Sequence, residues 1–221
     1  MISAQDHKRI SDGDMGANTG GMGAYAPAPV MTKELDKIVY DTILLPAVKA
    51  MKKEGCSFKG CLYAGLMITK DGPKVVEFNC RFGDPETEAV LPLLESDLAK
   101  IMLACTKGTL KKESVEWKNA CAVDVVLASE GYPATHSSGE EIVGLEEAKK
   151  TGCLVFHAGS MKKKGRYFVN GGRVLNVAAV APTLKEARDK AYEGVSKISW
   201  RGMQYRHDIA DKGLKRSKKG K

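Results

Sequence analysis

The segment from Glu77 to Glu86 most constrains what this chain can fold into. Polar and apolar residues alternate at its start, so a strand over residues 75–81 has two chemically different faces. Its apolar face carries Val76, Phe78 and Cys80 and is predicted to join the core. Its polar face carries Glu77, Asn79 and Arg81. A carboxylate, an amide oxygen and a guanidinium in one line suit a divalent metal ion that is shared with phosphate oxygens.

Two interpretations of this polar face remain open. It is either the solvated side of an edge strand or a site for phosphoryl transfer. The Gly-Asp-Pro-Glu turn over residues 83–86 adds two carboxylates directly after the strand and favours a site. Residues 62–69 predict the partner strand, and residues 70–73 predict the turn of a hairpin.

A glycine-rich stretch near the N-terminus is a candidate binding loop. Clustered glycines permit positive φ and let backbone N–H groups converge on an anion or a small substrate. The alternative is a plain connector, because Gly20-Gly21-Met22-Gly23 matches neither the Walker A pattern nor G-x-G-x-x-G.

Local signals place several helices. Thr32, Asp97 and Thr183 are predicted N-caps, and Pro46 is expected to kink or end the first helix. Polar residues 107–117 predict a connection to a second packing unit.

That second unit is predicted to be a small α+β module. It contains strands over residues 121–128 and 153–158, a hairpin of 167–170 against 174–180 about Gly171-Gly172, and a final helix. Asp124 and His157 are interpreted as structural residues. Core positions predicted across the chain are Leu66, Ile68, Val76, Phe78, Val123, Val125, Val155 and Val177.

Composition indicates a soluble, cytoplasmic globular protein. No apolar run approaches the roughly 20 residues of a membrane span, and the first nine residues lack the order of a signal peptide. The six cysteines form no C-x-x-C pair and are predicted to be reduced, mostly buried thiols. The net charge is +8, but six lysines and arginines after residue 211 leave only +2 for the rest. This basic end is predicted to be a disordered tail, and the nearly neutral body argues against nucleic acid as a partner.

Five segments, taken in order, resemble the glycinamide ribonucleotide synthetases (phosphoribosylamine–glycine ligases), which are ATP-grasp enzymes of de novo purine synthesis. They are Gln5-Asp6-His7-Lys8-Arg9, residues 18–25 (Asn-Thr-Gly-Gly-Met-Gly-Ala-Tyr), 63–67 (Tyr-Ala-Gly-Leu-Met), 77–87, and 170–175 (Asn-Gly-Gly-Arg-Val-Leu). The resemblance covers about residues 4–210, and 77–87 is its most specific part. It implies an α+β chain: the C-terminal part of an ATP-grasp fold, with antiparallel strands and helices, then a small α+β domain.

The resemblance also implies roles for individual residues. Glu77 and Asn79 would hold a catalytic Mg²⁺ or Mn²⁺, and Arg81 would be the catalytic residue that stabilises the transferring phosphate. The substrate pocket would be lined by Gly20, Gly21, Met22, Gly23, Asp84, Pro85 and Glu86. ATP would activate glycine as glycyl phosphate, which the amine of 5-phosphoribosylamine attacks to give glycinamide ribonucleotide, ADP and phosphate. A metal and an arginine suit this chemistry because charge accumulates on the transferred phosphoryl oxygens.

The match departs from the family pattern at Met15, Ala17 and Glu88, where members usually carry threonine or glycine, proline, and glutamine. The expected domains are the ATP-grasp portion with the metal site (residues 1–108), the C-terminal α+β domain (109–208) and the basic disordered tail (209–221). The N-terminal substrate domain and the subdomain with the phosphate-covering loop have no counterpart before Gln5. We therefore expect the chain to have little or no ligase activity alone and the missing N-terminal half to be its partner.

Two other functions remain in competition. Another ATP-grasp enzyme, such as a carboxylase or a peptide-like ligase, would use similar residues, although the segment 81–86 resembles the glycinamide family more. The other is a non-catalytic fragment or binding module that contacts a polyanion through its basic end.

Overall fold

The computed structural model describes residues 1–219 and divides them into two compact units. The first, which we call the sheet unit, comprises residues 1–28, 84–93 and the described residues from Lys118 onwards. The second, the hairpin unit, comprises Pro29–Gly83 and Leu94–Trp117. The structure thus groups residues 1–28 and 84–93 with the C-terminal residues, whereas the sequence analysis expected residues 1–108 to form one domain and residues 109–208 the next.

A five-stranded antiparallel sheet forms the centre of the sheet unit. Its strands, in spatial order, are β1 (Gln5–Asp6), β4 (Gly23–Ala26), β7 (Cys121–Ala128), β12 (Arg173–Ala181) and β9 (Leu154–His157). Strand β4 pairs with β7 along its whole length, from Gly23 opposite Val125 to Ala26 opposite Ala122. This pairing is the reason that the N-terminal residues belong to the same unit as the C-terminal ones.

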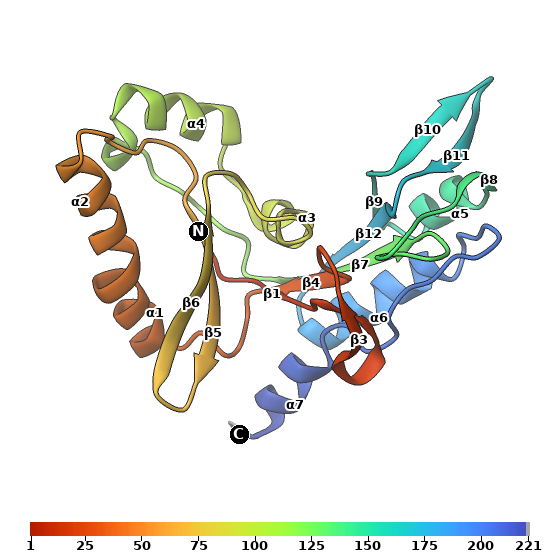
Figure 1. Cartoon of the computed structure of the whole chain (residues 1–221), viewed down its shortest axis with the longest axis horizontal. Coiled ribbons are helices and arrows are strands. Elements are labelled where there is room, and N and C mark those ends of the chain that lie inside the picture. The colour runs from red at the N-terminus through yellow and green to blue at the C-terminus, as the bar shows by residue number, and fades with distance from the viewer. Residues whose placement is uncertain (220–221) are drawn as a thin grey trace. The chain divides into compact units, whose positions relative to one another are not determined.

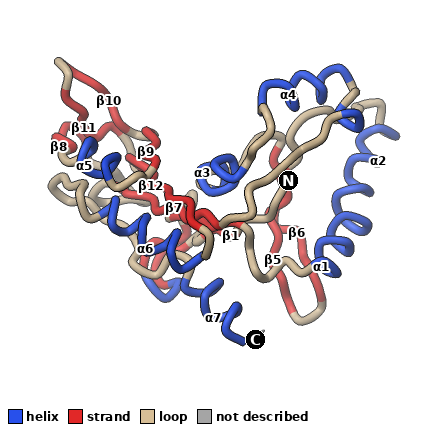
Figure 2. Tube along the Cα trace, turned by 180° about the vertical axis from the view of Figure 1, so that it is seen from behind, coloured by secondary structure: helices blue, strands red, loops and turns tan. Residues whose placement is uncertain are grey.

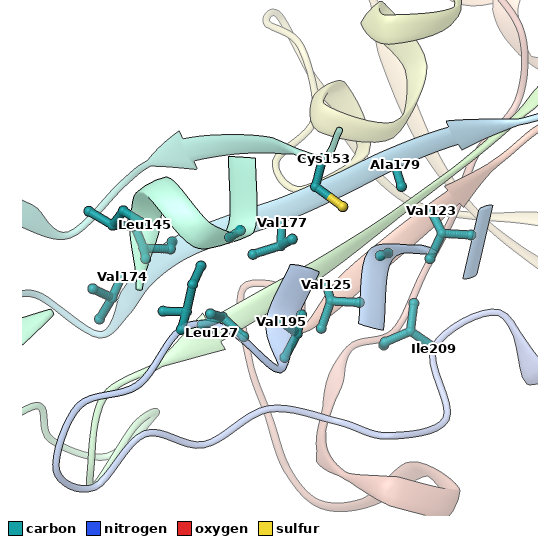
Figure 3. Close-up of a cluster of buried hydrophobic side chains, with 14 of the residues drawn as sticks. Val123, Val125, Leu127, Leu145, Cys153, Val174, Val177, Ala179, Val195 and Ile209 are labelled. Atoms are coloured by element: carbon teal, nitrogen blue, oxygen red, sulfur yellow. The ribbon is translucent and has the colours of Figure 1, made fainter. Parts of the chain in front are cut away.

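Helices cover both faces of this sheet (Figure 1). Helix α6 (Leu184–Val195) packs on one face and the short helix α3 (Glu86–Val90) on the other. Alternate β7 residues Val123, Val125 and Leu127 are fully buried in the α6-side core with Val177 and Val195 (Figure 3). Because both faces are covered, every residue of β7 from Ala122 to Ala128 is buried. Val123, Val125 and Val177 are confirmed as core residues, and Val155 is half-buried.

The sheet unit also holds smaller elements. A three-stranded sheet has the order β10 (Ser160–Lys163), β11 (Arg166–Asn170), β8 (Ser138–Ile142), and β2 (Arg9–Ser11) pairs with β3 (Met15–Asn18). Helix α5 (Leu145–Lys150) precedes β9. The predicted hairpin of residues 167–170 against 174–180 is wrong, because β11 and β12 belong to different sheets. The chain crosses between them at Gly172, where a Cβ would lie 2.4 Å from Cδ2 of Tyr132.

The hairpin unit begins with one long helical segment. Helix α1 (Lys33–Val39) is capped by Thr32, whose hydroxyl accepts a hydrogen bond from the Leu35 N–H as predicted. A π-helical turn (Tyr40–Leu44) leads into α2 (Leu45–Lys53). Pro46 does not end the helical segment. It lies in the first turn of α2, directly after the π-helical turn that separates α2 from α1. Helix α4 (Leu98–Lys107) starts at its predicted cap Asp97.

The predicted hairpin is present as β5 (Tyr63–Thr69) and β6 (Gly72–Asn79) (Figure 2). These two strands form a sheet by themselves, so its apolar face is not covered as the sequence predicted. Val76 is 67% exposed and Phe78 45% exposed, and Cys80 is exposed as well. Leu66 and Ile68 are only half-buried. The core prediction is therefore wrong for Val76, Phe78 and Cys80. The prediction of mostly buried cysteines is wrong as well, because Cys153 alone among the six is buried.

The basic end differs from its prediction too. Residues Asp211–Lys219 form helix α7. A disordered tail is wrong for this segment because Gly213 packs closely against Leu184 and Tyr25, which anchors the helix to the sheet unit. The predicted tail also includes residues 220–221, which lie outside the described residues. None of the helices formed by residues 1–219 is long and apolar enough to cross a membrane.

Candidate functional site

The predicted metal ligands lie at the end of β6 in the hairpin unit. Glu77 stands opposite Gly65 and Asn79 opposite Tyr63, and a bulge places the extra residue Val76 just before them. Their two-residue spacing keeps both side chains on one face of the strand. Gly65 gives Glu77 room, since a Cβ there would lie 3.1 Å from Cγ of Glu77.

This donor pair fits Mg²⁺ or Mn²⁺ in chemistry and in number. Within residues 1–219, no three side chains of His, Cys, Asp or Glu are grouped so that they could hold a metal ion. One carboxylate and one amide oxygen are a small set of hard oxygen ligands. Mg²⁺ is commonly held by one or two carboxylates and completes its octahedron with waters and substrate phosphates.

Arg81 does not share the strand as predicted. Strand β6 ends at Asn79, and Arg81 lies in the irregular segment that follows. Its guanidinium Nη1 donates a 2.8 Å hydrogen bond to the carbonyl oxygen of Phe82. The side chain is exposed, so its role at a phosphate stays a prediction.

The backbone N–H groups of the glycine-rich loop in the sheet unit do not converge on a common point where an anion could bind. The Gly20 N–H donates to the hydroxyl of Tyr132 at 2.9 Å, the Gly21 N–H to Oγ1 of Thr19 at 2.9 Å, and the Met22 N–H to the carbonyl of His7 at 2.9 Å. These donors are occupied within the chain. The expectation that they converge on an anion is therefore not met in this structure.

Close packing explains these glycines instead. At Gly21, with φ of +122°, a Cβ would lie 2.4 Å from Cδ of Pro85 and 2.7 Å from Oδ1 of Asp6. At Gly23, with φ of +140°, it would lie 2.5 Å from the carbonyl oxygen of Asp124. Side chains at these positions would push the loop off both neighbours.

This packing brings two predicted substrate segments together within one unit. Gly21 lies against Pro85, and Arg173 at the start of β12 contacts both Gly20 and Asp84. Nη1 of Arg173 lies 3.0 Å from Oδ1 of Asp84 in an ion pair. Gly20 and Asp84 are exposed, whereas Gly21, Met22, Gly23, Pro85 and Glu86 are buried. The substrate-binding roles of all seven residues stay predictions.

Acidic side chains gather around the same segments. Burial raises the pKa of Asp6 to about 6, against the opposing effect of its 2.5 Å ion pair with Lys8 and with a further increase from Glu86. Burial also raises the pKa of Glu88, helped by Asp84. Surroundings with several carboxylates suit an amine-bearing ligand.

Asp124 is the residue that sequence analysis underestimated. It was interpreted as a structural hydrogen-bonding residue, yet it is fully buried on β7 and neither carboxyl oxygen has a hydrogen-bond partner. Burial raises its pKa well above the ordinary range, and Glu88, Asp84 and Asp6 raise it further. The available signal was its position within an otherwise apolar run, because a strand buried on both faces buries its polar residue as well.

His7 fixes the end of the glycine-rich loop. Its ring is 1% exposed, and Nδ1 lies 3.1 Å from the carbonyl oxygen of Gly23, which also accepts from the His7 N–H at 3.0 Å. Burial lowers the pKa of His7 to about 4. The ring is therefore neutral at physiological pH and donates from Nδ1.

Comparison with known proteins gives two family matches. Residues 1–87 match "Phosphoribosylglycinamide synthetase, ATP-grasp (A) domain", and residues 122–212 match "Phosphoribosylglycinamide synthetase, C domain". A phosphoribosylamine–glycine ligase of Vigna unguiculata is 51% identical over 207 residues, which are 91% of this chain and 67% of the relative. The chloroplastic ligase of Arabidopsis thaliana is 51% identical over 220 residues, which are 97% of this chain and 41% of the relative.

Solved structures agree with these matches. A crystal structure of phosphoribosylamine–glycine ligase from Thermotoga maritima superposes with a TM-score of 0.80 at 41% identity, covering 94% of this chain and 51% of that protein. N5-carboxyaminoimidazole ribonucleotide synthetase from Thermotoga maritima shares the fold, with a TM-score of 0.54 at 19% identity over 80% of this chain and 45% of that one. The predicted ATP-grasp fold class, with antiparallel strands and helices, is confirmed. The chain spans about half the length of several curated bacterial relatives that it matches.

Proposed function

Because this chain belongs to the phosphoribosylglycinamide synthetase family, we propose that it supplies the metal strand and the substrate loops of a phosphoribosylamine–glycine ligase. The observation that carries the proposal is the meeting of two of the family's motif segments in the sheet unit. Gly21 packs on Pro85, and one nitrogen of Arg173 contacts both Gly20 and Asp84.

The proposed reaction joins glycine to 5-phosphoribosylamine at the expense of ATP. The glycine carboxylate attacks the γ-phosphorus of ATP, which gives glycyl phosphate and ADP. The amine of phosphoribosylamine then attacks the acyl carbon, and phosphate leaves as glycinamide ribonucleotide forms. Both nucleophile and electrophile must be held in one geometry, which is the contribution expected from the substrate loops.

The residues of the hairpin unit serve the first step. Glu77 and Asn79 would bind Mg²⁺ or Mn²⁺, which when bound neutralises charge on the phosphate oxygens. Arg81, exposed and three residues before Asp84, would turn its guanidinium from the Phe82 carbonyl to the transferring phosphoryl group. In the sheet unit, the carboxylates of Asp84 and Glu86 would orient the amine-bearing substrates.

The 221 residues are proposed to need a further polypeptide for activity. The relatives are about twice as long, and Val75, Val76 and Phe78 of β6 expose apolar surface that a soluble protein normally covers. We propose that the part of the relatives not matched by this chain packs there and completes the ATP site. We keep a cytoplasmic location as part of this proposal.

The test is ADP release that depends on glycine, phosphoribosylamine and Mg²⁺. The purified chain is assayed alone and mixed with the separately expressed part of a relative that this chain does not cover. Activity only in the mixture, lost with Glu77→Ala and kept with the exposed control Glu54→Ala, is the expected result. A folded chain that is inactive in both conditions would overturn the proposal.

Two alternatives receive less support. Another ATP-grasp chemistry is disfavoured because the neighbours with other printed activities are at most 19% identical, against 41% for the glycine ligase. A polyanion-binding module would use Lys212, Lys215 and Arg216 of α7. Lys212 already pairs with Asp14, which leaves fewer charges for a partner.

A further inference from the structure

We propose that Arg173 and Tyr132 are a positioning pair that holds the segments Gly20–Gly23 and Asp84–Glu86 in one arrangement. The inference rests on the proposed function, since it assigns these segments to the substrate site. It concerns two residues from the C-terminal part of the sheet unit, neither of which was a predicted site residue.

Arg173 contacts two separate segments through one nitrogen atom. Its Nη1 lies 3.1 Å from the carbonyl oxygen of Gly20, 2.9 Å from the carbonyl oxygen of Asp84 and 3.0 Å from Oδ1 of Asp84. A single nitrogen thus joins two segments that are far apart in the sequence. The side chain is 21% exposed, so these charge-assisted bonds are partly shielded from water.

Tyr132 holds the backbone N–H of Gly20, the residue whose carbonyl oxygen Arg173 contacts. Its hydroxyl accepts the Gly20 N–H at 2.9 Å. Both the N–H and the carbonyl of Gly20 are therefore fixed by side chains from beyond residue 130. Nζ of Lys8 also lies 3.4 Å from the Gly20 carbonyl oxygen, so Arg173 and Tyr132 add two shorter bonds to this longer one and orient the exposed glycine.

Each of the two side chains also packs against a glycine. A Cβ on Gly172 would lie 2.4 Å from Cδ2 of Tyr132, so the tyrosine ring packs directly on the backbone that precedes Arg173. A Cβ on Gly20 would lie 3.1 Å from Cζ of Arg173, so the guanidinium covers Gly20. Both side chains therefore act on Gly20, Tyr132 through the N–H and Arg173 through the carbonyl oxygen.

The chemistry favours arginine at this position. The planar guanidinium can cover Gly20 and still reach the Asp84 carbonyl and carboxylate, whereas the ammonium of lysine is a point charge. A shift of the loops by about 1 Å is enough to reduce turnover about 100-fold, because reacting groups must meet in one geometry. Arg173 and Tyr132 are thus positioning residues, and no contact with substrate is assigned to them.

The variants for the test are Arg173→Ala, Arg173→Lys and Tyr132→Phe. The matched control is Arg166→Ala, which breaks an exposed ion pair with Glu141 in the same unit. Hydrogen exchange of the whole chain is followed by mass spectrometry, and ligase kinetics are measured in the complemented mixture. Thermal unfolding midpoints establish that each variant is folded.

We expect Arg173→Ala to speed exchange about 10-fold in peptides covering residues 18–25 and 82–88 together, with the remaining sheet strands unchanged. Turnover of Arg173→Ala should fall about 100-fold, and Arg173→Lys should show a similar loss. Added guanidinium should restore part of the turnover of Arg173→Ala. Arg166→Ala should behave as wild type. Tyr132→Phe should affect residues 18–25 only. The positioning role of the pair is overturned if Arg173→Ala leaves hydrogen exchange unchanged in either peptide, or if this variant keeps wild-type turnover. A wild-type mixture without ligase activity overturns the proposed function instead, and the exchange data then still decide whether the pair holds both segments.

Discussion

Replacing Asp124 with valine is expected to stabilise the sheet unit and to remove part of its pH dependence. Asp124 is 0% exposed and both carboxyl oxygens lack hydrogen-bond partners. Its cross-strand neighbours Ala24 and Ala178 are small, and we expect the slightly larger valine to fit beside them. Valine also suits the centre of a buried strand.

The magnitude follows from proton linkage. Burial raises the folded-state pKa of Asp124 well above its ordinary 3.8. At a pH between 3.8 and the raised folded-state pKa, Asp124 keeps its proton in the folded protein and releases it in the unfolded chain. Rising pH therefore favours unfolding. The free energy of unfolding should fall by about 1.4 kcal/mol per pH unit through this group. Above pH 3.8, wild type should therefore lose stability as pH rises, whereas the valine variant should not lose stability through this group. Removing an unsatisfied buried carboxyl should add about 1–3 kcal/mol at any pH.

The assay is urea unfolding followed by the fluorescence of Trp200, which is 7% exposed in the sheet unit. A Trp117→Phe background removes the other tryptophan, which belongs to the hairpin unit. Asp124→Asn is the matched control, because it removes the titration and retains a buried polar group. If the stability difference between wild type and the valine variant stays constant from pH 5 to pH 6, Asp124 is ionised in the folded protein and the reasoning fails.

Three further predictions concern the sheet unit. Arg206→Met should cost about 3–5 kcal/mol, because the fully buried guanidinium holds Asp208 at 2.7 Å; a thermal midpoint within 2 °C of wild type would contradict this. Thr183→Ala should cost about 1–2 kcal/mol by removing the capping box of α6, and an unchanged urea midpoint would contradict it. His7→Gln should remove a gain in stability of about 1.4 kcal/mol per pH unit between pH 4 and 6.5. That window follows because the buried ring resists protonation, and parallel stability curves for both proteins would refute it.

Local rules predicted the elements whose stabilising contacts are local. The caps at Thr32, Asp97 and Thr183 depend on a side chain three residues from its partner, and all three are present. The β5–β6 hairpin also follows from adjacent strands and a short turn. Such contacts are encoded within a few residues and can be read without the rest of the chain.

Features set by distant segments were missed. The sequence around Gly171-Gly172 has the signature of a hairpin, but the tyrosine ring that occupies the inner side of this turn comes from residue 132. Helix α7 has the composition of a disordered tail, yet Gly213 fits against Tyr25 at the other end of the chain. Composition and periodicity do not contain such contacts, because they arise only when the sheet assembles.

In the candidate site, too, the features set by local sequence were predicted and those set by distant segments were missed. Glu77 and Asn79 were found from the strand period, since one strand is sufficient to place both on one face. The candidate binding loop was identified from its glycines, but the predicted role of those glycines is wrong. Their N–H groups are bonded within the chain, and their missing side chains admit Pro85, Asp6 and Arg173. A glycine-rich loop can therefore serve a site by permitting close approach of its neighbours rather than by presenting its own donors. In this chain that approach lets a single arginine contact two separate segments, so their arrangement depends on a residue far from either of them in the sequence.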